Sequence, residues 1–235
     1  MDRLLWDRGV RARAGEIAAA SALTGARDSA ALEGADVTVD VVRAGLDDSP
    51  LGRAVAASVA VTSAVPGQVD AWSRAPLQVL AHLHAIAARG FEDDEALGRP
   101  RQQDEVVDPL HVGSPPSWRE VPDRLVGLAD VLTRPTSSPA ILVAAIAHGE
   151  LMAVQPFRWG SGLIARAAVR LVIASRGVDP DLLGCPEAGM LSLGRSSYVA
   201  ALRGYRSGEP EGVAEWIRWN ASAIGFGASA DAPHR

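Results

Sequence analysis

Alanine and other apolar residues recur along most of this chain at spacings of three and four, and this periodicity constrains its fold more than any other feature. Strict alternation of apolar and polar residues is nearly confined to the stretch DVTVDVV at 36–42. Spacings of three and four put apolar side chains on one face of an α-helix. We therefore expect an all-α fold, with helices at about 10–32, 51–64, 76–89, 121–133, 138–153, 163–176, 195–206 and 210–225.

The segment from Gly90 to Pro122 breaks this pattern, because it is polar and rich in proline and glycine. Loops of this length inside a compact domain usually serve a function or are mobile. We expect a short β-hairpin flap at about 90–120, since the helices on either side are too few to form separate cores. One domain over residues 1–228, followed by a flexible tail at 229–235, is then the predicted organisation.

The composition excludes several classes of function. All 23 basic residues are arginine, and without lysine the chain can perform neither Schiff-base chemistry nor Walker-type phosphate binding. A net charge of -5 does not favour nucleic acid or an anionic membrane. The single cysteine, Cys185, cannot form an internal disulfide, and the N-terminus has no apolar stretch of signal-peptide length. A cytoplasmic protein with a buried or loop thiol is expected.

The stretch AVQPFRWGSGLIARAAVRLV, at 153–172, combines a glycine-rich turn with the start of a helix. Backbone N–H groups and the helix dipole at such a turn, here Gly160, Ser161 and Gly162, suit a phosphate group. No side chain in this stretch readily accepts a proton at neutral pH. The residues indicate a phosphate site without an evident base.

The same stretch resembles the active-site signature of the Fic (Fido) family, H-x-F-x-[DE]-G-N-G-R-x-x-R, in a register that begins at Gln155 and ends at Arg166. Residues 29–34, SAALEG, resemble the inhibitory motif [ST]-x-x-x-E-[GN] of many Fic proteins. The helix AAIAHGELMAVQPF and the C-terminal segment YVAALRGYRSGEPEGVAEWIRWNASAI are also similar to the family. The resemblance implies a Fic helical fold with an N-terminal inhibitory helix at about 10–34 and a core motif at 155–166.

Family members transfer AMP from Mg-ATP to a protein hydroxyl (AMPylation), and this chain departs from their signature at the reactive positions. Gln155 replaces the histidine that accepts the hydroxyl proton, and an amide has no useful basicity. Trp159 replaces the acidic residue that holds Mg²⁺, an ion that needs oxygen ligands. Ser161 replaces an asparagine, and Leu163 replaces an arginine that contacts phosphate. The base, the metal ligand and one cation are absent together.

Other residues keep their place in the family motifs. The resemblance implies a salt bridge between Glu33 and Arg166 that blocks the ATP γ-phosphate, with Ser29 and Gly34 completing the inhibitory motif. Trp159 could stack on an adenine or plug the vacated pocket. The candidate nucleotide or phosphate contacts are Trp159, Gly160, Ser161, Gly162 and Arg166.

None of the histidines is a clear replacement for the missing base. His148 precedes Gln155 by about two helical turns, roughly 10 Å, which is too far for direct proton transfer. His84 matches a family core helix, and His82 faces another side of that helix. His111, on the expected flap, is either a surrogate base or a solvated loop residue.

Two functions therefore stay open, and whether the chain is an enzyme is undecided. One is an adenylyltransferase-like pseudoenzyme that acts by binding a ligand or partner. The other is a transferase of altered chemistry that uses a phosphorylated donor in the Fic pocket. No cofactor is assigned, although ATP is a candidate and Mg²⁺ is not expected. Candidate partners are a nucleotide or phosphorylated small molecule, a protein target and a second copy of the chain, but neither nucleic acid nor membrane.

Overall fold

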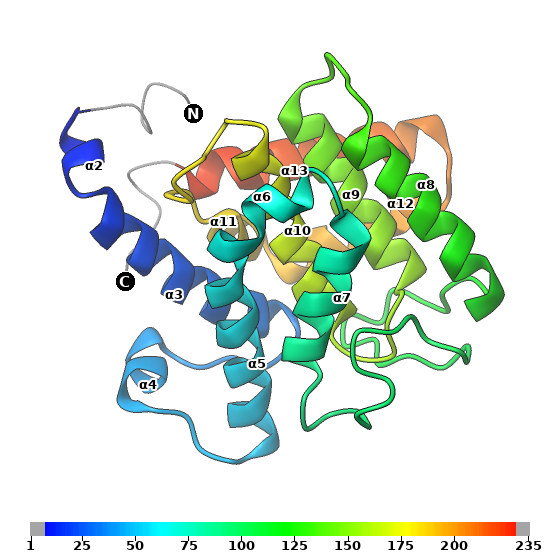
Figure 1. Ribbon diagram of the computed structural model, residues 1–235, viewed down its shortest axis with the longest axis horizontal. Coiled ribbons are helices and arrows are strands. Elements are labelled where there is room, and N and C mark those ends of the chain that lie inside the picture. The colour runs from blue at the N-terminus through cyan, green and yellow to red at the C-terminus, as the bar shows by residue number, and fades with distance from the viewer. Residues whose placement is uncertain (1–7, 229–235) are drawn as a thin grey trace.

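The computed structural model describes residues 8–228, and within them the fold is built from α-helices without a β-sheet (Figure 1). In chain order the elements are α2 (Arg8–Ala12), α3 (Ala14–Leu32), α4 (Val39–Ala44), α5 (Pro50–Ala64), the 3-10 turn η1 (Val65–Gln68), α6 (Val69–Trp72), α7 (Pro76–Ala87), the 3-10 turn η2 (Trp118–Glu120), α8 (Val121–Thr133), α9 (Ala140–Val154), α10 (Ser161–Ser175), α11 (Pro186–Leu193), α12 (Arg195–Arg206) and α13 (Pro210–Gly227). The predicted all-α fold is confirmed. The tail predicted at 229–235 lies outside the described residues.

The centre of the molecule is α10, in which every residue from Ser161 to Ala174 is buried. It contacts α9, α7, α6, α5, α3 and α11. Figure 1 shows α2 to α5 on the left, α8 and α12 on the right, and α10 between them. Its partner α9 is apolar on nearly all sides, which is typical of a helix with no face exposed to water. The pair forms the frame on which the motif loop at 155–160 is held.

Glycine allows unusually close packing between α11 and α13. A Cβ atom at Gly189 would lie 1.9 Å from the backbone oxygen of Ala223, and one at Gly227 would lie 2.0 Å from that of Cys185. Real Cβ atoms do not approach other atoms this closely, so the two helices can cross here only because both positions lack a side chain.

The alternating stretch DVTVDVV does not form a strand. The Thr38 side chain accepts a hydrogen bond from the Val41 N–H at 3.3 Å and begins the short helix α4. A lone strand has no partner for its backbone groups in a helical protein, whereas a capped helical turn satisfies some of them locally.

The prediction of a β-hairpin flap is wrong, because within residues 8–228 the segment forms only an isolated bridge between Arg89 and Glu92. Residues 101–117, called the strap below, run as an irregular chain across the end of the molecule that carries the motif loop. Much of the strap backbone bonds to arginine side chains instead of to a second strand. None of the described helices combines the length and apolar character needed to cross a membrane.

Candidate functional site

The motif loop between α9 and α10 is fixed by its own hydrogen bonds. Gln155 ends α9 in the left-handed conformation, with φ 43°, and Gly160 has φ 76° just before α10. The Ser161 hydroxyl accepts from the Phe157 N–H at 3.2 Å and donates to the Phe157 carbonyl at 3.0 Å. The His84 ring stacks on the Phe157 ring, with ring centroids 3.9 Å apart. The loop is thus a defined turn and not a mobile segment.

The structure brings Glu33 and Arg166 together across 133 positions of sequence. The Arg166 NH2 group lies 2.6 Å from Glu33 Oε1, and its Nε and NH2 groups donate to the Ser29 hydroxyl at 2.7 Å and the Ser29 carbonyl at 3.1 Å. The guanidinium is fully buried, whereas 17% of the Glu33 side chain is exposed. This contact joins the C-terminal end of α3 to the first turns of α10.

The Glu33 carboxylate also lies against the N-terminus of α10. A Cβ atom at Gly162 would be 2.1 Å from Glu33 Oε1, so only glycine admits the carboxylate here. The partial positive charge of a helix N-terminus favours an anion in this position. The predicted phosphate-binding turn is therefore filled by a carboxylate of the chain itself.

A buried polar chain runs behind Arg166. The Asn220 amide donates to the Trp216 carbonyl at 3.0 Å, which leaves its oxygen, 2.8 Å away, to accept from His148 Nδ1. The Tyr198 hydroxyl then donates to His148 Nε2 at 2.6 Å. Burial lowers the pKa of His148 to about 3 and raises that of Tyr198 to about 12. His148 is therefore neutral, and its two ring nitrogens are both occupied by hydrogen bonds within the core.

Trp159 packs against the protein itself. Its indole stacks on the Phe91 ring with centroids 3.9 Å apart, and the Arg53 guanidinium lies 6.0 Å from the centroid of Phe91. The cavity beside Trp159 has a volume of only about 90 Å³. Its lining residues are Ala30, Glu33, Ala35, Ala54, Val107, Pro109, Trp159, Gly160 and Leu163. Pockets for small molecules typically have about 300–1,000 Å³, so this cavity is smaller than a nucleotide needs.

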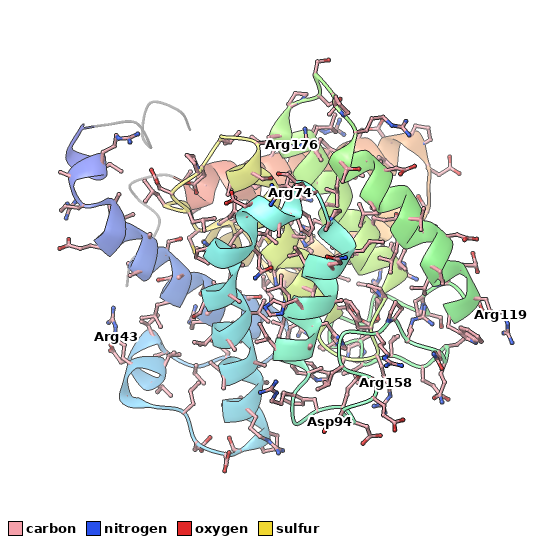
Figure 2. All side chains as sticks on the ribbon, viewed as in Figure 1. Arg43, Arg74, Asp94, Arg119, Arg158 and Arg176 are labelled. Carbon is pink, nitrogen blue, oxygen red and sulfur yellow. The ribbon has the colours of Figure 1, made fainter. Side chains whose placement is uncertain are left out.

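The residues at the reactive positions do not fit Mg²⁺. Trp159 offers no oxygen ligand, and the buried Leu163 side chain adds only apolar surface to the cavity. Within residues 8–228, no cluster of three or more histidine, cysteine or acidic side chains could hold a metal ion. Arg158 is exposed, and Figure 2 places it at the same lower edge of the molecule as Asp94, away from the α3 side.

The other residues singled out in the sequence lie elsewhere. His111 is exposed on the strap and is not among the residues that line the cavity, and His82 is exposed on α7. Cys185 is buried, which raises the pKa of its thiol to about 12 and makes a nucleophilic role unsuitable.

Sequence reasoning did not predict the contacts that two arginines, Arg101 and Arg170, make beside this site. Arg101 is buried and donates to the carbonyls of Val154 and Gln155, the last residues of α9. Arg170 is buried on α10 and forms a bidentate pair with Glu187, at 2.8 and 2.7 Å. Residue spacing in the sequence predicts neither contact, because the partners of each arginine lie on other elements of the fold.

Residues 75–173, from α7 to the end of α10, match the Fic/DOC family. The chain contains a Fic domain. A search of curated proteins found no match. The matched Fic region includes the motif loop and the strap, while α3 with its Glu33 lies outside it.

Solved structures of Fic proteins share the fold over most of the chain. A Fic family protein from Desulfovibrio desulfuricans G20 has a TM-score of 0.74 at 17% identity, covering 95% of this chain and 68% of its own. A fragment of Fic-1 from C. elegans has a TM-score of 0.62 at 19% identity, covering 86% of this chain and 61% of its own. A point variant of that fragment has a TM-score of 0.62 at 17% identity, with coverages of 93% and 65%. This chain thus spans less than two thirds of the Fic-1 chains.

Proposed function

We propose that this Fic domain does not transfer AMP and acts by binding. The observation that carries the proposal is that Gln155, Trp159 and Leu163 replace the base, the metal ligand and a phosphate cation, and that the cavity lined by Trp159 and Leu163 has a volume of only about 90 Å³. A positioned general base typically contributes about 10² to 10⁴ in rate. These three groups act at different steps of one reaction, so no single other residue could replace all of them.

The binding side of the proposal rests on the groups that the motif retains. Arg166 and the turn at Gly160 and Gly162 present positive charge and backbone N–H groups to the place where the Glu33 carboxylate lies. A phosphorylated small molecule such as a nucleotide would compete with Glu33 for this place. Its binding also requires Trp159 to leave Phe91, because the present cavity is too small.

Thermal unfolding with ATP, ADP and AMP, each with and without Mg²⁺, tests the binding side. We expect no shift for the wild type and a shift for Glu33→Gly that is the same with and without Mg²⁺. A ligand at a hundred times its Kd stabilises the folded state by about 2.7 kcal/mol. Glu211→Gly, which removes an exposed carboxylate of α13, is the control and should behave as the wild type does. Binding at this site is contradicted if Glu33→Gly responds to none of the three nucleotides.

Intact-mass spectrometry after incubation with Mg-ATP and a cell extract tests the absence of transfer. We expect no AMP adduct on the chain or on extract proteins, either from Glu33→Gly or from Glu33→Gly combined with Gln155→His. The histidine restores a base but not the oxygen ligand lost at Trp159. An adduct made by Glu33→Gly alone would overturn the proposal.

One observation favours a transferase of altered chemistry as the second candidate. The Nη1 group of Arg166 is buried and has no hydrogen-bond partner of good geometry, although the Tyr198 hydroxyl lies beside the guanidinium. Buried donors are rarely left unpaired, and an anionic donor substrate would supply the partner. This candidate predicts a covalent mass change on a target in the absence of Mg²⁺, which Arg166→Ala abolishes.

A further inference from the structure

The strap is held against α12 by three arginines of that helix, and every acceptor is a backbone carbonyl. Arg195 donates to Pro109, and Arg203 donates to His111 at 2.8 Å. Arg206 donates through NH1 to Val112 at 2.6 Å and Gly113 at 3.0 Å, and through NH2 to Ser114. We call Arg195, Arg203 and Arg206 the clamp. Their spacings of eight and three residues place them on one side of the helix.

The ends of the strap are anchored differently from its middle. At its start, Arg101 donates through Nε to the Gln155 carbonyl at 2.8 Å and through NH2 to that of Pro116 at 2.6 Å, so one side chain ties both ends of the strap to the motif loop. In the middle, the Val107 N–H donates to the Arg158 carbonyl at 2.7 Å. The span between Val107 and Pro116 is the part that the clamp holds.

This span forms one wall of the cavity. Val107 and Pro109 line it together with Ala30 and Glu33. Movement of 107–114 away from α12 would therefore widen the cavity without disturbing α9 or α10. Among the described residues the clamp arginines form no ion pair. The hydrogen-bond partners of these three charged side chains are therefore neutral carbonyl groups. Such bonds can be broken without separating opposite charges.

We propose that the clamp is a gate: it keeps the strap closed over the cavity, and release of Arg195, Arg203 and Arg206 gives ligands access to it. The inference deepens the proposed function, since it concerns access to the same cavity, and it rests on that function for the ligand. The contacts that carry it belong to α12 and the strap, not to the motif residues.

Thiol labelling measures the opening directly. Leu163 lines the cavity and is 4% exposed, so Leu163→Cys in a Cys185→Ala background gives one reporter thiol at the cavity. In this background we compare labelling by DTNB with and without the triple substitution Arg195→Ala, Arg203→Ala and Arg206→Ala. We expect the labelling rate to rise by about tenfold or more, because local opening sets the rate of access to a buried group. Arg218→Ala, which removes an exposed arginine of α13, is the matched control and should leave the rate unchanged.

Hydrogen exchange in the same proteins separates a local gate from general loosening. The gate predicts faster exchange in 107–114 with unchanged exchange in α9 and α10. An unchanged labelling rate in the clamp variants would overturn the inference, and so would faster exchange throughout α9 and α10. Arg203→Lys with Arg206→Lys keeps the charge but loses the forked donor geometry, and it should give an intermediate rate. Because no nucleotide is present, the result is independent of whether the cavity binds one.

Discussion

Arg166 is a fully buried guanidinium whose position depends on groups from three other helices. Glu33 and Ser29 contact it from α3, while Tyr198 and His148 lie behind it on α12 and α9. Removing one partner of a buried ion pair leaves the other charge uncompensated, which costs more than the pair contributes when intact. The cost of weakening this contact therefore measures how strongly the C-terminal end of α3 is fixed to α10.

We expect Glu33→Gln to lower the free energy of unfolding by about 1–3 kcal/mol, since the amide keeps one acceptor but loses its charge. Urea denaturation at pH 7 measures the change. Glu211→Gln removes the carboxylate of an exposed pair with Arg218 and should cost less than about 0.5 kcal/mol. Equal effects of the two substitutions would mean that the Glu33 contact contributes no more than a surface ion pair.

The buried His148 makes stability depend on pH. Its pKa is about 3 in the folded protein, because burial disfavours the charged ring, against 6.5 for an unperturbed histidine. The unfolded state thus binds a proton that the folded state does not, so this stability is fully present above pH 6.5 and is lost as the pH falls toward 3. His148→Gln cannot titrate in this range. We expect the difference in unfolding free energy between wild type and His148→Gln to shrink by about 1–2 kcal/mol from pH 6.5 to pH 5. A constant difference would contradict a neutral, buried His148.

At the residue scale, the sequence predicted the contacts whose two ends both lie in motifs. Glu33 and Arg166 are such a pair, and the structure brings them together. Arg101 lies outside the quoted motifs, and Tyr198 and Asn220 lie in the C-terminal segment that resembles the family, where no motif assigns them a role. Their roles follow from where their elements pack, and packing partners are set by the whole fold and not by local spacing.

At the scale of elements, the crossing of α11 and α13 depends on glycine. Gly189→Ala would place a methyl group 1.9 Å from the Ala223 oxygen, and we expect a loss of about 1–3 kcal/mol from the resulting displacement. Gly225 on the same helix pair has open space where its Cβ would be. Gly225→Ala should therefore be neutral or stabilise by up to about 1 kcal/mol through helix propensity. Thermal unfolding of both variants measures the contrast, and a loss for Gly225→Ala equal to that for Gly189→Ala would refute it.

Helices with a clear apolar face were predictable, and the predicted bounds of 121–133 and 195–206 are those of α8 and α12. The eight-residue helix α11 was missed, since it is too short to show a period. The hairpin was predicted wrongly because a polar segment rich in proline and glycine indicates a loop but not its partner. Here the partner is the arginine face of α12, about 90 residues further along the chain.

At the scale of the whole molecule, the single thiol reports on unfolding. Cys185 is buried between α10 and α13, and burial raises its pKa to about 12. We expect DTNB to label the native protein no faster than it unfolds globally, and to label one thiol at once in concentrated urea. Labelling rates measured across a urea series should follow the unfolding rate. Rapid labelling without urea would show that the α11–α13 region opens on its own.

A strap fastened through its carbonyls has a consequence for how such a protein can change over evolutionary time. Every residue type has a backbone carbonyl, so substitutions in 109–114 leave the acceptors of the three α12 arginines in place. Substitutions of the arginines themselves have no such protection. The wall of the cavity can therefore acquire new side chains, and with them new ligand preferences, while the means of closing it is inherited unchanged.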